Sequence, residues 1–187
     1  MIDQGLIGRV QYIYSNRLNY GKVRTQEDAF WSLAPHDISI FQHIAGQYPS
    51  ELLSHGSKIL QNGIYDSTIT KIKYENGIEG HIFVSWLHPF KEHRLVIIGS
   101  EAMISFEDSI DGKPLKFFSK KYEISGKSPI KRDGPVKLIK YDNLEPLEQE
   151  LSYFINLENN KTHVADGNHA IDVIRILVDA SHQLKKG

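Results

Sequence analysis

The sequence predicts an α+β domain in which helices gather on one face of an open, predominantly antiparallel or mixed sheet of about six or more strands. Three observations lead to this prediction. The middle of the chain is a succession of β-hairpin patterns, amphipathic helical segments flank them, and the composition is that of an ordinary globular protein. With 187 residues, 40% hydrophobic and 24% charged, we expect a single domain spanning residues 1–187.

The hairpin patterns predict most of the strands. The clearest surrounds Asn76-Gly77, because this dipeptide favours the tight turns that join antiparallel strands. In its second arm Ile82, Val84 and Trp86 alternate with other residues and therefore share one face. The other expected strands adjoin turns at 99–100 and 111–112, or occupy 8–18, 51–60 and a late segment 136–141 within an otherwise loop-like stretch 125–143.

Three segments have the period of amphipathic helices: 30–46, 144–159 and 167–187. Gly46 is expected to end the first of them. The predicted apolar stripes are Ile38, Phe41, Ile44 and Ala45 in the first helix, Leu147, Leu151, Phe154 and Ile155 in the second, and Ile171, Ile174, Leu177 and Val178 in the third. We expect these helices to lie on one face of the sheet.

Composition excludes several functions. A net charge of −1 with scattered Lys and Arg gives no basic footprint for nucleic acid. There is no cysteine, no apolar run approaching the ~20 residues of a membrane helix and no signal-peptide pattern at the start. These features predict a soluble, cytoplasmic protein without a membrane partner.

Metal and cofactor motifs are also missing from the sequence. It contains no GxxxxGK[ST], GxGxxG, HExxH or GxSxG pattern. The pairs His88 with His93 and His163 with His169 lack the helical spacing and the carboxylate partner of a metal site. We therefore expect no metal-binding residues and no cofactor-binding residues in this chain.

His36 stands out because it follows Pro35 at the expected start of a helix. Proline fits the first turn, where its missing N–H costs nothing. The stripe formed by Ile38, Phe41 and Ala45 points into the core, which leaves His36 at its edge or outside it. Ser32 lies four residues earlier and shares a face with His36 if the helix extends back that far. Local physics leaves two alternatives open, a catalytic histidine and a structural or capping one.

Four segments together resemble a known family. They are "DQGLIGRVQYIYSNRLNYG", "FWSLAPHDISIFQHIAGQYPSEL", "NGIEGHIFVSWLHPFKEHRLVIIGSEAMISFED" and "IDVIRILVDASHQLKKG". In this order, from residue 3 to the end, they resemble the C-terminal half of the Gfo/Idh/MocA oxidoreductases. The resemblance implies a fold similar to the C-terminal domain of glyceraldehyde-3-phosphate dehydrogenase, with an open sheet that packs against another subunit.

The resemblance also implies site residues. The family's Asp-x-x-x-His segment falls on residues 32–36, so His36 becomes the catalytic candidate beside the reacting hydroxyl, while Ser32 replaces the usual aspartate. Asp37 matches a frequent His-Asp pair. As substrate-binding candidates the resemblance gives Ser32, Asp37, Lys91 in a W-x-x-P-x-K segment, and Arg17 and Asn19 at the end of the first strand.

Partners follow from the same resemblance. The family's NAD- or NADP-binding Rossmann domain has no counterpart in this sequence, so we expect the cofactor in the full-length enzyme, none on this chain alone, and a catalytically silent isolated chain. The expected partners are a sugar-type small molecule, the missing Rossmann domain and a second copy bound through the open sheet face. The alternative is a non-catalytic binding or assembly module that kept the sheet and lost the dehydrogenase chemistry.

Overall fold

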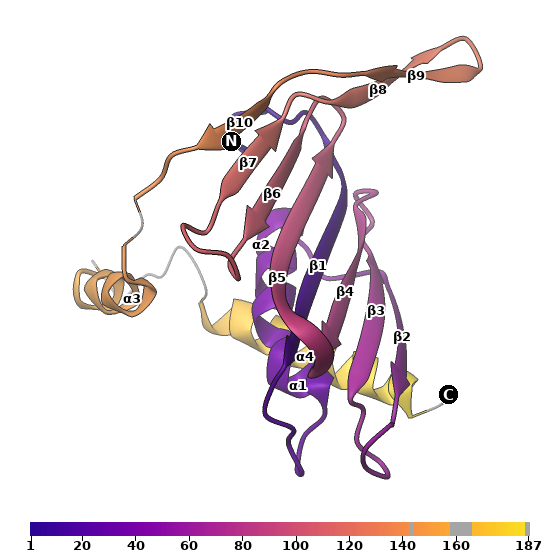
Figure 1. Cartoon of the computed structure of the whole chain (residues 1–187), viewed down its shortest axis with the longest axis vertical. Coiled ribbons are helices and arrows are strands. Elements are labelled where there is room, and N and C mark those ends of the chain that lie inside the picture. Colours follow the sequence, from indigo (N-terminus) through magenta and orange to yellow (C-terminus); the bar gives the residue numbers. More distant parts are fainter. Residues whose placement is uncertain (143, 158–165, 186–187) are drawn as a thin grey trace.

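The computed structural model describes residues 1–142, 144–157 and 166–185. Eight strands form one open sheet in the order β10-β7-β6-β5-β1-β4-β3-β2 (Figure 1). Their bounds are β1 Val10–Tyr20, β2 Glu51–Ser57, β3 Ser67–Lys73, β4 Glu79–Ser85, β5 Leu87–Gly99, β6 Met103–Glu107, β7 Leu115–Phe118 and β10 Val136–Ile139. Only β1 and β4 pair in parallel, and the other neighbours are antiparallel. The predicted α+β class with a mainly antiparallel sheet is confirmed.

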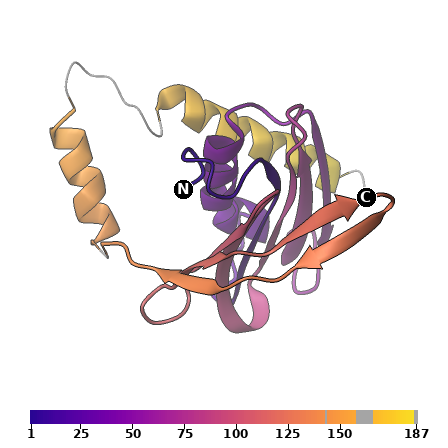
Figure 2. The same ribbon diagram turned by 90° about the horizontal axis from the view of Figure 1, so that it is seen from above.

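Three helices cover one face of the sheet, α1 Ala29–Leu33, α2 Pro35–Ala45 and α4 Gly167–Leu184, and no described helix lies over the opposite face (Figure 2). The core lies between the helices and the sheet. Its fully buried members include Ile13, Ile72, Ile82 and Val84 from the strands, Phe30, Ile38 and Phe41 from α1 and α2, and Ile176, Leu177 and Ala180 from α4.

Two glycines shape the surroundings of α2: one ends the helix, and the other lets the helix and the sheet approach closely. Gly46 ends the helix in the left-handed region, with φ of 68°, as the sequence predicts. A Cβ at Gly80 would lie 2.2 Å from the carbonyl oxygen of Ile13 and 2.9 Å from the Phe41 ring. Because no side chain fits there, β4 approaches β1 and α2 closely.

The predicted helical segment 30–46 is present as two short helices instead of one. Helix α1 precedes α2 and is capped by Asp28, whose Oδ1 accepts a hydrogen bond of 3.0 Å from the Trp31 N–H. The backbone stays α-helical through Ala34. Pro35 then divides the segment because it has no N–H to donate. The expectation that Pro35 occupies the first turn is confirmed for α2, but one more helical turn stands before it.

The other two predicted helices exist, but their apolar stripes do not pack as expected. Helix α3, Pro146–Ile155, buries none of its residues and stands apart from the sheet in both views (Figures 1 and 2). In α4, Leu177 is buried as predicted, whereas Ile171 and Ile174 are each 50% exposed. The face of α4 that packs on the domain consists of Val173, Ile176, Leu177, Ala180 and Leu184.

The stretch expected to be a loop contains more structure than predicted. Strands β8 Lys121–Ser125 and β9 Ser128–Arg132 form a separate antiparallel hairpin that projects from the sheet (Figure 1). The sequence does not predict this hairpin because charged side chains lie on both of its faces, so it has no clear apolar face. The predicted late strand is confirmed as β10.

Candidate functional site

The predicted site residues lie where β1 ends, β5 begins and α1 meets α2. Arg17 on β1 and Asp37 on the first turn of α2 form an ion pair across the sheet–helix interface. Arg17 Nε donates to Asp37 Oδ2 at 2.6 Å and Nη2 donates to Oδ1 at 3.3 Å. The side chains are only 18% and 5% exposed. The structure therefore joins two predicted substrate-binding residues to each other and ties the start of α2 to β1.

His36, one residue before Asp37, is exposed on the first turn of α2. Pro35 fixes the backbone on one side and the buried Asp37 anchors it on the other, so the backbone that carries this imidazole has a defined position at the protein surface. Ser32 lies on α1 and is half-buried. Its hydroxyl cannot replace the charge of a carboxylate beside the imidazole.

Lys91 and Asn19 lie at the same end of the sheet. Lys91 is exposed near the start of β5. Asn19 is half-buried, and its Oδ1 is enclosed without a hydrogen-bond partner in the described part of the chain. The Asn19 amide lies against Gly21, where a Cβ would be 2.4 Å from Oδ1. An unsatisfied acceptor at a strand end is consistent with binding a donor from outside the chain.

His93 lies at the same end of β1 and β5 as Arg17 and Lys91, although its spacing from His88 in the sequence raised only the question of a metal ligand. It is directly opposite Arg17 in the β1–β5 register. Its Nε2 is buried and has no partner within the described residues. Burial, with help from the nearby charges of Arg17 and Lys91, lowers the pKa of His93 and outweighs the opposite effects of Asp108 and Asp37. The ring is therefore neutral at pH 7.

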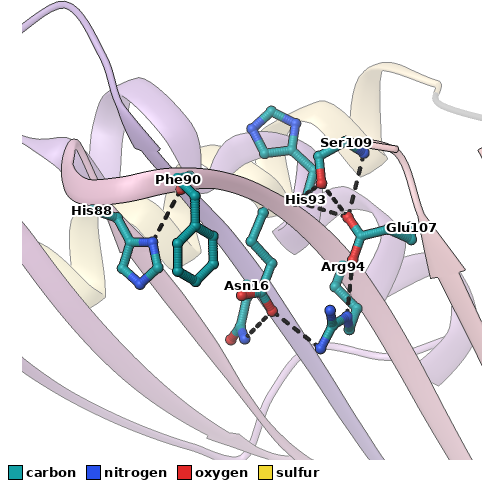
Figure 3. Close-up of polar contacts among 8 residues, drawn as sticks. Asn16, His88, Phe90, His93, Arg94, Glu107 and Ser109 are labelled. Carbon is teal, nitrogen blue, oxygen red and sulfur yellow. Dashed lines mark hydrogen bonds and ion pairs between the residues drawn. The ribbon is translucent and has the colours of Figure 1, made fainter. Parts of the chain in front are cut away.

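A second polar network lies on the other side of β5 (Figure 3). The Arg94 guanidinium points away from the His93 ring and donates from Nε to Glu107 Oε2 at 2.9 Å. Glu107 also accepts hydrogen bonds from the backbone N–H of His93 and from the hydroxyl and N–H of Ser109. Arg94 contacts Glu92 as well. No motif in the sequence indicates this network, because its members meet only when β5 and β6 pair.

The open face of the sheet is apolar and aromatic beside this network. Tyr14 stacks on His81, with ring centroids 5.3 Å apart, and Tyr12 shares a hydrogen bond of 2.8 Å with the same imidazole. A cavity of about 340 Å³ opens next to them, lined in part by Tyr14, Val96, Met103 and Phe118. Arg94, Glu107 and Lys116 also line this cavity, so charged and apolar side chains meet on the open face.

A cavity of about 650 Å³ lies between α1, the β2–β3 connection and the end of α4. Trp31, Lys58 and Tyr65 are among its lining residues, and none of the six predicted site residues is. The predicted residues lie instead at one end of the two central strands β1 and β5 and at the start of α2, where His36 and Lys91 are exposed while Arg17 and Asp37 are enclosed.

The described residues contain neither a cluster of metal-ligand side chains nor an apolar helix of membrane length. Within residues 1–142, 144–157 and 166–185, no three His, Asp or Glu side chains gather as a metal would need. His163, one of the paired histidines noted in the sequence, lies outside the described residues. None of the described helices combines the length and the hydropathy needed to cross a lipid bilayer.

The sequence matches the model of a protein family, and the fold matches solved structures. The family model described as the GFO/IDH/MocA C-terminal domain matches residues 1–105. No curated protein matches the sequence significantly. Among solved structures, UDP-N-acetylglucosamine 3-dehydrogenase GnnA from Acidithiobacillus ferrooxidans is 20% identical with a TM-score of 0.77, and the match covers 99% of this chain and 58% of GnnA.

Two other solved structures share the fold. Aldose-aldose oxidoreductase from Caulobacter crescentus has a TM-score of 0.72 at 10% identity, with 100% of this chain and 56% of that chain covered. The WlbA dehydrogenase from Bordetella pertussis, solved with NADH and UDP-GlcNAcA, has a TM-score of 0.68 at 16% identity, with 100% and 55% covered. The chain thus spans a little over half the length of these proteins, and at these identities the likeness establishes the fold.

Proposed function

The chain belongs to the Gfo/Idh/MocA family as its C-terminal domain, and from this membership we propose that it is the substrate-binding and oligomerisation domain of an NAD(P)-dependent oxidoreductase. The substrate is a hydroxyl or ketone of a sugar, polyol or nucleotide sugar. Support comes from what the similar structures are named for, a UDP-N-acetylglucosamine 3-dehydrogenase, an aldose-aldose oxidoreductase, and a dehydrogenase holding NADH and UDP-GlcNAcA.

The observation that carries the proposal is the position of His36. It is an exposed imidazole at a helix start whose backbone is held by Pro35 and the Arg17–Asp37 ion pair. An imidazole presented in this way can hydrogen-bond a reacting hydroxyl or accept its proton. Lys91, Asn19 and Ser32 surround the same end of the sheet and supply further contacts to the substrate. Because Ser32 stands where the family has an aspartate, His36 acts without a carboxylate from that position.

The nicotinamide cofactor accepts or delivers the hydride in this class of enzyme. The residues of this chain do not fit a dinucleotide, because the sequence has no glycine-rich turn that would bring backbone N–H groups to a pyrophosphate. We therefore assign none of its residues to the cofactor, and place NAD or NADP in the part of the full-length protein that corresponds to the unmatched remainder of the relatives.

The test uses the full-length protein that carries this domain together with a dinucleotide-binding domain. Formation of reduced cofactor is followed with NAD⁺ and NADP⁺ in turn, with glucose, myo-inositol and UDP-N-acetylglucosamine as substrates. We expect turnover of at least one substrate and a loss of 10²-fold or more in kcat for His36→Ala, the usual contribution of general acid–base catalysis.

His43→Ala is the matched control, since His43 is an exposed histidine on the last turn of the same helix. We expect it to retain full activity. Equal activity of the two variants would remove His36 from the mechanism. If no substrate is turned over with either cofactor, the oxidoreductase proposal fails and the assembly-module alternative takes its place.

A further inference from the structure

Helix α3 carries an apolar stripe that the described residues do not cover. Leu147, Leu151, Phe154 and Ile155 recur at helical spacing and are between 52% and 77% exposed. The helix has only 10 residues and buries none of them. Because an isolated helix of this length is marginal in water, α3 requires a packing surface that the described residues do not supply.

Helix α4 has a second apolar stripe, on the side that faces away from the core. Ile171 and Ile174 are each 50% exposed and Val178 is 36% exposed, at positions that share one side of a helix. A cavity of about 470 Å³ opens on this side of α4. Its described lining residues are Tyr48, Asp172, Ile174, Arg175, Val178 and Asp179. The outer side of α4 is therefore hollowed and combines apolar with charged side chains.

The outer stripe of α4 cannot turn into the core of this domain. The opposite side of the helix is already packed there through buried residues that include Ile176 and Leu177. His169 Nε2 shares a hydrogen bond of 2.8 Å with Ser39 Oγ on α2, which fixes the start of α4. The Tyr48 hydroxyl donates to Asp179 Oδ2 at 2.9 Å, which fixes its middle. The stripe is therefore available only to a partner.

Both stripes belong to the helix-covered side of the molecule. From the β10 edge of the sheet, α3 extends towards the side on which α2 and α4 lie (Figure 2). The open face, through which we expect a second copy to bind, is on the other side of the sheet. A two-fold dimer uses the same patch on both subunits, so a second copy bound through the open face leaves α3 and the outer side of α4 uncovered.

The comparison with GnnA indicates the partner. The match covers 99% of this chain, so both helices belong to the shared fold, but it covers only 58% of GnnA. The unmatched remainder is the part to which we assign the dinucleotide-binding domain. Interfaces between domains of one chain combine apolar with polar contacts. The two stripes and the charged residues of α4 beside them have this mixed character.

We propose that the exposed stripe of α3 and the outer stripe of α4 together form the surface on which the dinucleotide-binding domain of the full-length protein docks. The identity of this partner rests on the proposed oxidoreductase function. Docking supplies the packing surface that α3 requires. Helix α4 then serves both domains, with Ile176 and Leu177 in the core of one and Ile171 and Ile174 against the other.

Amide hydrogen exchange of residues 146–155 tests the proposal. It is compared between the 187-residue chain and the full-length protein that carries it together with a dinucleotide-binding domain. A docked helix exchanges only when the domains separate, whereas an exposed helix opens locally. We expect exchange about ten-fold slower, or more, in the full-length protein. Equal rates in the two proteins overturn the proposal. So does protection of the 187-residue chain that grows with its concentration, because a second copy then covers α3.

Ile174→Glu tests whether α4 belongs to the same surface. In the full-length protein it should raise the exchange rate of the α3 amides about five-fold or more, because the carboxylate loses water when the domains dock. Ile124→Glu is the matched control, at an isoleucine 74% exposed on the β8–β9 hairpin, and should leave that rate unchanged. Both variants of the 187-residue chain should keep its melting temperature, since both side chains are exposed. Equal exchange rates in the two full-length variants overturn the role of α4.

Phe154→Glu provides a second variant, on α3 itself, where the side chain is 71% exposed. It should also accelerate exchange of the α3 amides in the full-length protein, and it decides the matter if Ile174→Glu lowers the melting temperature of the 187-residue chain. An unchanged rate overturns the proposal. None of these measurements uses turnover. A protected α3 in a protein that transfers no hydride would remove the oxidoreductase function and keep the interface, and hydride transfer with an unprotected α3 would do the reverse.

Discussion

Two arginine–carboxylate pairs lie almost back to back on the two faces of the sheet. Arg17 bonds Asp37 on the helix-covered face, and Arg94 bonds Glu107 on the open face. The two arginines lie close together along the paired strands β1 and β5. Arg17 is opposite His93, and Arg94, the next residue of β5, is opposite Asn16. Their surroundings differ. Arg17 is 18% exposed and Arg94 is 43% exposed, so water replaces a lost partner of the arginine more completely on the open face.

The same pair of residue types therefore has different consequences on the two faces. Among the described residues, only Arg17 bonds the Asp37 carboxylate. Glu107 accepts from Ser109 and from the His93 backbone in addition to Arg94. Losing one partner therefore leaves an enclosed charge on the covered face, whereas on the open face it leaves a network with other donors.

The largest effect is expected from breaking the covered pair. Asp37→Asn removes the charge that compensates Arg17 while keeping the shape of the side chain. We expect a loss of about 3 kcal/mol in the free energy of unfolding, the lower end of the range for a buried pair, because Arg17 retains some exposure. Urea denaturation of the chain measures this loss.

Glu123→Gln is the control for Asp37→Asn. Its pair with Arg132 has side chains 42% and 56% exposed, so we expect no measurable change in the free energy of unfolding. Losses of similar size in the two variants would contradict the contrast between enclosed and exposed pairs.

The next effect concerns association through the open face. Val96 lines the cavity there together with Tyr14 and Met103, and a second copy of the chain would enclose this surface. We expect dimers at micromolar concentration, and Val96→Asp should raise the dissociation constant at least ten-fold, about 1.4 kcal/mol, because the new carboxylate loses water in the interface. Sedimentation velocity measures both.

Ile174→Glu is the control for Val96→Asp, since Ile174 is 50% exposed on α4, on the covered side of the molecule. It should leave the dimer unchanged. A strictly monomeric chain at these concentrations, or equal dissociation by both variants, would move the association surface away from the open face.

The sequence predicts most strands of the large sheet because they combine a two-residue period with a turn at one end, whereas the β8–β9 hairpin lacks a clear period. The hairpin around Asn76-Gly77 is confirmed as β3 and β4, and Ile82 and Val84, predicted to share one face, are both buried. Helix α2 is equally well defined, since its apolar residues form a single stripe. An open, mainly antiparallel sheet follows from these local patterns, but the strand order and the parallel pairing of β1 with β4 do not.

Helix α4 shows where the sequence is not sufficient. Apolar residues occupy more than one of its faces, so the period alone does not decide whether Ile174 or Ile176 packs on the sheet. Only Ile176 is buried. His93 is a similar case for the site. Its importance comes from Arg17 opposite it, and that neighbour depends on the β1–β5 register, which no local pattern contains.

The smallest effect is a pH dependence on the open face. Burial alone raises the pKa of Glu107, but hydrogen bonds from Ser109 and Arg94 outweigh it and lower the pKa below the ordinary value of 4.5. The folded state therefore binds the proton more weakly than the unfolded state, and the ionised carboxylate stabilises the protein above about pH 4.5. That contribution disappears as the pH falls through the folded-state pKa.

Glu107→Gln tests this sign. The amide keeps an acceptor oxygen but loses the charge, so we expect a cost of about 1 kcal/mol near pH 7. Below the folded-state pKa the original chain has lost the same charge, so the difference between the two proteins should shrink towards zero. Urea denaturation of both from pH 7 down to pH 3 measures it. A difference that stays constant or grows in acid would show that Glu107 contributes through its shape and not its charge.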